Sequence, residues 1–194
     1  MTQQAEGAAD LARRCAGDLR DRDWAGDDEL ASQLDAAVGD RPAPMLRPLA
    51  VDLEQLADIL EGDPMHGGGR IDLRTGEVWP QAAMDYAGEV GGPDEEDLDN
   101  VDRWLAVWCE GSGDAYRDME YFIGTLADED RADRLSIAIE GRGAFGRFKD
   151  VLKRWPDELA RWYVFSGERE RGRARYWLAA AGYWSRRPES HQST

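Results

Sequence analysis

The sequence predicts an α+β fold, in which a small antiparallel sheet made of a hairpin and a third strand packs with a C-terminal helical bundle of about four helices. Two observations lead to this fold class. Between residues 70 and 80 the apolar side chains alternate with polar ones, which is the period of a strand. From residue 112 onwards they recur every three or four positions, which is the period of an amphipathic helix. A chain of 194 residues is long enough to form one domain with a substantial core.

An acidic segment precedes this region. Residues 1–24 are rich in Ala, Arg and Asp but carry few large apolar side chains, which is typical of a frayed helix or of disorder. Leu30, Leu34 and Val38 then recur at four-residue steps, so a short amphipathic helix is expected. Three prolines between Arg41 and Pro48 predict a linker. We therefore expect three parts: an acidic extension over residues 1–48 that is partly helical or disordered, a single α+β domain over residues 49–184, and a disordered tail over residues 185–194.

The sheet is predicted from two short stretches. Ile71 alternates with charged residues, Thr75-Gly76 is a turn signal, and Val78-Trp79 resumes the apolar pattern, which together indicate a β-hairpin. Residues 103–110 are predicted to be a third strand, apolar enough to be central. Between them, residues 89–102 are expected to form a solvated acidic loop. One helix is expected before the hairpin, because four apolar side chains share one face: Leu53, Leu56, Ala57 and Leu60.

Four helices are predicted after residue 112. Ser112 or Asp114 can cap the first, and Asp128 or Asp130 can cap the second, because short polar side chains accept hydrogen bonds from free N–H groups at a helix start. The third follows a glycine-rich joint. Pro156 opens the fourth, which continues to about residue 182, with a possible kink at Gly172.

The joint between the second and third helices has two interpretations. Gly141, Gly143 and Gly146 have the spacing of a dinucleotide-binding fingerprint, which needs a strand such as residues 136–140 before it. Against this, no further alternation of strand and helix would build a parallel sheet. The apolar residues after the joint step by three, four and three, as in a helix: Phe145, Phe148, Leu152 and Trp155. We therefore expect a joint in which Gly141 ends one helix at positive φ and Gly143 lets the next begin.

The helix after this joint carries cationic side chains away from its apolar face. Combined with the free N–H groups at its start, these side chains predict a surface that attracts anions. The alternative is an ordinary solvated face, and the two differ in the salt dependence they predict. The candidate binding residues are Arg142, Gly143, Arg147, Lys149, Lys153 and Arg154.

Charge is distributed unevenly along the chain. The net charge is −16, but residues 1–140 hold 12 Lys and Arg against 34 Asp and Glu, whereas residues 141–194 hold 12 against 6. The main hypothesis is therefore a non-enzymatic binding or regulatory domain whose basic C-terminal part engages an acidic partner. That partner would be a protein segment, a phosphorylated ligand or nucleic acid, and the acidic N-terminal part is expected to fold over the same surface.

Two other classes of function are considered. An enzyme would have to use carboxylates, the only abundant acid–base groups, and the candidates are Asp118, Glu120 and Glu140. Asp118 and Glu120 point to different faces of one helix, so no catalytic residue is assigned. The third class is a structural protein–protein interaction module, dimeric through the aromatic C-terminal helix, because eight tryptophans leave room for an exposed apolar patch.

The cysteine and histidine content and the hydropathy of the sequence limit which compartment and which kinds of site are expected. Cys15 and Cys109 are the only cysteines, and the start of the chain is polar, so a cytoplasmic protein with two free thiols and no membrane span is expected. His66 and His191 are too few and too far apart in sequence for a zinc site or a histidine-based triad. No metal or other cofactor is expected.

Several motifs resemble a known family. They occur in the same order and spacing as in a bacterial group, uncharacterised protein family 0158, over about residues 51–182. The family pattern tends to carry arginine where this chain has Gly146, which weakens the dinucleotide interpretation. The resemblance implies no established activity, substrate or cofactor. The matching stretches are Ile71–Val78, Tyr116–Ile123, Glu140–Phe145, Arg147–Leu152 and Trp162–Phe165.

Overall fold

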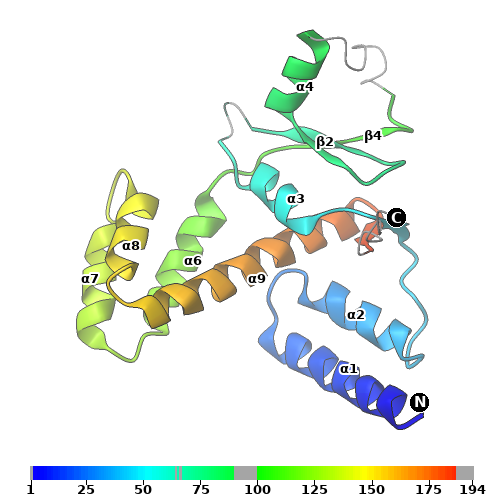
Figure 1. The fold of residues 1–194 in the computed structure, drawn as a ribbon, viewed down its shortest axis with the longest axis horizontal. Helices are drawn as coiled ribbons and strands as arrows, with labels where there is room; N and C mark the ends of the chain where they lie inside the picture. Colours follow the sequence, from blue (N-terminus) through cyan, green and yellow to red (C-terminus); the bar gives the residue numbers. More distant parts are fainter. Residues whose placement is uncertain (1, 64, 66, 90–99, 187–194) are drawn as a thin grey trace, which may run out of the picture.

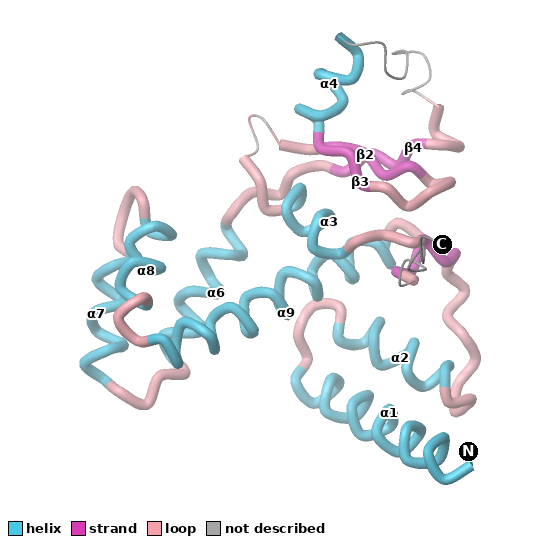
Figure 2. Tube along the Cα trace, viewed as in Figure 1, coloured by secondary structure: helices cyan, strands magenta, loops and turns pink. Residues whose placement is uncertain are grey.

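One long helix organises the molecule. The structure is a computed structural model that describes residues 2–63, 65, 67–89 and 100–186. Helix α9 (Pro156–Ala180) crosses it diagonally (Figure 1). It contacts α2 (Asp27–Ala37), α3 (Leu53–Leu60), α6 (Gly113–Gly124), α8 (Ala144–Leu152) and β5 (Tyr183–Ser185). The α+β fold class is confirmed, with the strands towards the C-terminal end of α9 and helices packed along its length (Figure 2). None of the helices in these residues is long and apolar enough to cross a membrane.

The first two helices form a hairpin that packs on α9. Of the two expectations for residues 1–24, a helix or disorder, residues 2–22 form helix α1 (Thr2–Arg22), and α2 (Asp27–Ala37) follows as predicted. The turn between them rests on α9 through Gly26 and Gly172, where a Cβ on either glycine would overlap backbone atoms of the opposite segment. Figure 1 places this hairpin beside the C-terminal half of α9, so it does not cover α8. The division of the chain at residue 48 stays a prediction.

The predicted antiparallel sheet is confirmed, with a different strand at its centre. The hairpin consists of β2 (Gly69–Asp72) and β3 (Val78–Pro80), with Ile71 opposite Val78. The third strand, β4 (Trp104–Val107), pairs with β2 on its other side. The order is therefore β3-β2-β4, and the expectation that residues 103–110 form a central strand is wrong. Most of the acidic loop, residues 90–99, lies outside the described residues, as does His66.

Three elements of the sheet region were not predicted. Helix α4 (Gln81–Glu89) follows β3 directly. Strands β1 (Arg47–Leu49) and β5 (Tyr183–Ser185) form a separate parallel pair, which joins the end of the proline-rich stretch to the end of the domain. The predicted helix before the sheet is α3 (Leu53–Leu60), which packs on α9.

The four predicted C-terminal helices are confirmed. They are α6 (Gly113–Gly124), α7 (Glu129–Ile139), α8 (Ala144–Leu152) and α9, and Asp128 caps α7 by accepting a hydrogen bond from the Arg131 N–H (3.1 Å). Helix α9 runs through Gly172 without interruption, so the considered kink is absent. Phe145 differs from the prediction: it is 37% exposed and lies at the edge of the apolar face, while Phe148 and Leu152 are fully buried.

Helix α9 serves two separate cores. Its N-terminal half contributes Trp162 to a core with α6, α7 and α8, in which the rings of Phe122, Phe148 and Trp162 meet edge to face. Its C-terminal half contributes Ala174 and Leu178 to a core with α3 and the strands. The polar middle of α9, residues 168–173, therefore lies where the two cores adjoin.

Candidate functional site

The glycine joint connects two packed helices. Ile137 and Ile139 belong to α7, so the strand required by the dinucleotide interpretation does not exist. Gly141 (φ 72°) and Gly143 (φ 76°) both adopt the left-handed conformation, which glycine reaches without steric cost. Gly143 is the N-cap of α8. The joint is thus the predicted corner between helices.

The exposed side chain of Arg147 connects the two sides of this corner through hydrogen bonds. Its guanidinium donates to the backbone carbonyls of Ala138 (2.9 Å), Glu140 and Arg142. These carbonyls belong to the last turn of α7 and the loop after it, which have no intrahelical partner and carry the negative end of the helix dipole. Arg147 therefore stabilises the end of α7, and its donors are not available to an external anion.

The other candidate cations divide into two groups. Lys153 forms an ion pair with Asp150 one turn earlier (2.8 Å), and their mutual hydrogen bond raises the pKa of Lys153 and lowers the pKa of Asp150. Arg142, Lys149 and Arg154 are exposed, and none of their side chains forms a hydrogen bond or ion pair with another described residue. We call these three side chains the α8 cations.

The start of α8 adds backbone donors to this surface. No side chain caps the helix, and its first turn contains no acidic residue. The first backbone hydrogen bond of the helix runs from the Arg147 N–H to the Gly143 carbonyl (3.2 Å). The N–H groups of residues 144–146 precede that bond, and such groups attract negative charge. Arg142 lies next to them in the loop.

Arg147→Ala should destabilise the fold by about 1–3 kcal/mol, because several carbonyls at the end of α7 lose a charged donor. Urea unfolding followed by circular dichroism measures this. Lys149→Ala is the matched control on the same helix, and it should leave the unfolding midpoint nearly unchanged because the exposed Lys149 side chain forms no hydrogen bond with a described residue and only a solvent-screened attraction to Glu170. Equal effects of the two substitutions would show that Arg147 does not stabilise the joint.

Comparison with known proteins identifies this part of the chain. A model of the Uncharacterised protein family (UPF0158) matches residues 83–185, which is more than half of the 194 residues. The chain belongs to the UPF0158 family. The matched UPF0158 region is shorter than the stretch of the predicted resemblance, and the hairpin motif Ile71–Val78 lies outside it. A search of curated proteins and a search of solved structures found no match.

The UPF0158 region contains every candidate cation and also a buried ionic network. Asp118, on α6, is 1% exposed and accepts hydrogen bonds from the guanidiniums of Arg169 and Arg173 on α9. Arg173 also donates to Glu61 at the end of α3. This Asp118 network ties α6 and α3 to the polar middle of α9. The sequence signal for it was a charged residue within the apolar stripe of α6, next to Met119.

The three carboxylates considered for catalysis do not come together. Asp118 is occupied by two arginines, Glu120 is exposed, and Glu140 lies exposed after the end of α7. Within the described residues, no three His, Cys, Asp or Glu side chains are placed to hold a metal ion. Asp118, Glu120 and Glu140 therefore do not form a carboxylate pair of the kind that general acid–base catalysis requires.

Glu170 is a half-buried carboxylate beside the Asp118 network. Burial raises the pKa of Glu170, and the nearby charges of Asp118 and Asp58 raise it further, while Arg173 and Lys149 act in the opposite direction. The ionised carboxylate is thus less favourable in the folded than in the unfolded chain. Burial likewise raises the pKa of Glu61, against the lowering effect of Arg173.

Glu170→Gln should make the protein more stable than the wild type at pH 7. The raised pKa means that wild-type stability improves as the pH falls through the folded pKa of Glu170 towards its ordinary value of 4.5. The difference between the two proteins should therefore shrink as the pH is lowered. Urea midpoints between pH 4.5 and 8 measure it, and a difference that widens on acidification would contradict this view of Glu170.

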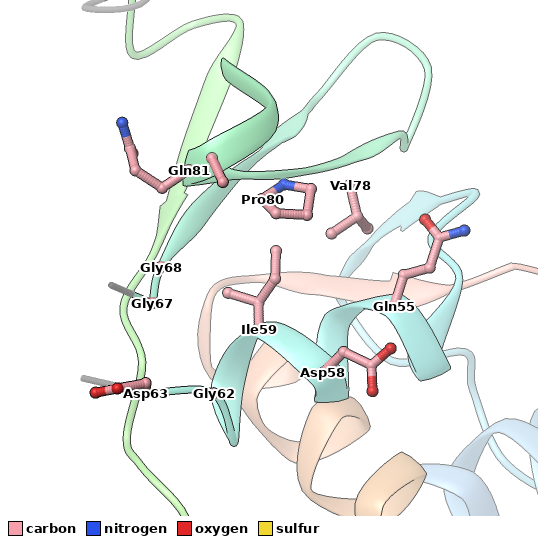
Figure 3. A pocket seen from close by; sticks show the side chains of 11 residues that line it. Gln55, Asp58, Ile59, Gly62, Asp63, Gly67, Gly68, Val78, Pro80 and Gln81 are labelled. Carbon is pink, nitrogen blue, oxygen red and sulfur yellow. The ribbon is translucent and has the colours of Figure 1, made fainter. Parts of the chain in front are cut away.

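A groove between α3 and the hairpin lies outside the UPF0158 region. It has a volume of about 540 Å³, and Figure 3 shows the Ile59 side chain directed towards Pro80 across it. Gln55 and Asp58 project from α3 at its rim, while Gly67 and Gly68 form the opposite wall with backbone alone. The lining is mainly apolar and carries no cation, so it does not extend the α8 surface.

Proposed function

We propose that the UPF0158 region is a non-enzymatic binding domain, which takes up an acidic protein segment at the start of α8. The observation that carries the proposal is the set of α8 cations: Arg142, Lys149 and Arg154 are exposed and unpaired among the described residues. Most other arginines of the described chain bind carboxylates or carbonyls, including Arg13, Arg22 and Arg173. An acidic segment would supply the missing carboxylates.

The choice of a protein segment over nucleic acid rests on charge and on Phe145. The chain has a net charge of −16, which repels a densely charged polyanion at long range. Phe145, in the first turn of α8, is 37% exposed and gives an apolar contact beside the cations. An acidic peptide with an apolar side chain fits both features. The two free thiols agree with a reducing cytoplasmic location for this domain.

The test is a fluorescence-anisotropy titration of the full chain with a labelled twelve-residue peptide of Glu and Leu. Replacing all three α8 cations by Gln should weaken binding by about 3- to 160-fold, since each exposed ion pair contributes about 0.2–1 kcal/mol. Wild-type affinity should also fall steeply with salt, because the contacts are exposed.

The control triple variant replaces Arg14, Arg41 and Arg74 by Gln, which changes the net charge equally at exposed positions elsewhere. It should bind the peptide as the wild type does. A single-stranded DNA of equal charge is the second probe. Tighter binding of the DNA than of the peptide, or equal losses in both triple variants, would argue against the proposal.

A further inference from the structure

A further, partly open cavity lies against the C-terminal half of α9, and it shares no lining residue with the groove of Figure 3. It has a volume of about 410 Å³ and is formed by the turn after α1, the start of α6 and the C-terminal half of α9. Both charged and aromatic side chains face it. Its lining residues are Trp24, Glu110, Asp114, Arg169, Arg173 and Tyr176, together with Ala25, Trp177 and Ala180.

Arg169 supplies a fixed hydrogen-bond donor to the cavity. Its Nε donates to Asp118, which leaves its two terminal NH2 groups without a partner among the described residues. The guanidinium lies among the rings of Trp24, Tyr121 and Phe165, at 5.1, 5.7 and 5.9 Å from their centres. A guanidinium held in this way is suited to binding a carboxylate through two parallel hydrogen bonds.

Two carboxylates, those of Asp114 and Glu110, also line the cavity, and the charge of Asp114 interacts with that of Arg169. Asp114 accepts a hydrogen bond from Arg117 through Oδ1, so Oδ2 remains available, and Glu110 has no described partner for its side chain. The Arg117 hydrogen bond lowers the pKa of Asp114, and the charges of Arg173 and Arg169 lower it further, so Asp114 is ionised at neutral pH. These two carboxylates can accept from an ammonium group.

The balance of charge around the cavity selects the kind of ligand. A simple anion would face more carboxylates than guanidiniums, and a simple cation would face Arg169. A molecule that carries one charge of each sign avoids both penalties. The charged groups around the cavity are the guanidiniums of Arg117, Arg169 and Arg173 and the carboxylates of Glu61, Glu110, Asp114 and Asp118.

The lining and the volume of the cavity determine the apolar part and the size of the ligand. The rings of Trp24, Tyr176 and Trp177 offer apolar surface for a ligand side chain beside the charged groups. A volume of about 410 Å³ is near the lower end for small-molecule sites, which span about 300–1,000 Å³. We propose that this cavity binds a free α-amino acid with an aromatic or aliphatic side chain, its carboxylate on Arg169 and its ammonium group on Asp114 and Glu110. This inference is independent of the function proposed for the α8 cations.

Calorimetric titration of the full chain with L-phenylalanine and L-leucine tests the ligand class. The matched probes are 3-phenylpropionate, which lacks the ammonium group, and 2-phenylethylamine, which lacks the carboxylate. L-phenylalanine or L-leucine should bind, and each single-charge analogue should bind at least about tenfold more weakly, because one end of the site is then left unpaired. No binding of either amino acid at millimolar concentration, or equal binding of an analogue, overturns the proposal.

Substitutions locate the binding. Glu110→Gln combined with Asp114→Asn should weaken binding of the amino acid at least about tenfold, because both acceptors of the ammonium group lose their charge. Tyr176→Ala should weaken it by removing part of the wall. Tyr163→Ala, at a comparably exposed tyrosine of the same helix, is the control and should have no effect. Binding that none of the cavity substitutions alters would place the ligand elsewhere and overturn the assignment.

Discussion

Asp118→Asn should lower the free energy of unfolding by about 3 kcal/mol, which is the lower end of the range for breaking a buried ion pair. Asp118 is almost completely buried, and its carboxylate accepts from both Arg169 and Arg173. An amide of the same shape leaves these two guanidiniums without their shared counter-charge. The lower end applies because the side chains of Arg169 and Arg173 keep 23% and 15% of their exposure to water.

Urea unfolding measured by tryptophan fluorescence tests this expectation. The matched control is Asp114→Asn on the same helix, which removes the exposed pair with Arg117. It should leave the unfolding midpoint almost unchanged, because exposed ion pairs contribute little. If Asp118→Asn were as mild as the control, the network would not be the connection that holds α6 and α3 to α9.

Gly172→Ala should destabilise the protein by about 2 kcal/mol, because the added methyl group overpacks a closed contact. Helix propensity alone predicts the opposite sign, since alanine is favoured over glycine inside a helix by about 1 kcal/mol. At Gly172 the added Cβ would overlap the backbone carbonyl of Ala25 in the turn between α1 and α2. The helical hairpin would have to move away from α9, and the edge-to-face contact of Trp24 with Phe165 would be lost.

Gly17→Ala is the control for this substitution. Gly17 lies in the middle of α1, and a Cβ there would meet no atom within 4 Å. It should therefore stabilise the protein by about 0.5–1 kcal/mol. Urea midpoints, together with limited proteolysis at the turn after α1, distinguish destabilisation by Gly172→Ala from stabilisation by Gly17→Ala. Stabilisation by both substitutions would mean that the hairpin is not packed on Gly172.

Local patterns predicted the elements whose partners are near in sequence. The hairpin of Ile71 and Val78, the start of α9 at Pro156 and the glycine joint each carry turn, proline or cap signals that act within a few residues. Strands β1 and β5 were missed because each has three residues and its partner lies more than 130 residues away. Helix α4 was missed because its described side chains include a single buried apolar one, Met84.

The candidate site was also predictable only where its features depend on residues near in sequence. The exposed position of Lys149 followed from helical spacing, because it falls off the apolar face of α8. The hydrogen bonds of Arg147 to the glycine joint could not be predicted from the spacing, since their acceptors are backbone carbonyls whose position depends on how α7 ends. The pairing of Asp118 with Arg169 and Arg173 depends on how α6 crosses α9, which no local pattern specifies.

The most direct test of the proposed binding surface is a nuclear magnetic resonance titration of the isotope-labelled full chain with the Glu and Leu peptide. We expect the largest amide shifts at residues 142–149, where the free N–H groups of α8 adjoin Arg142 and Lys149. The Arg142, Lys149 and Arg154 triple variant should lose these shifts. Shifts centred on another element, or no shifts at all, would contradict the assignment of this surface.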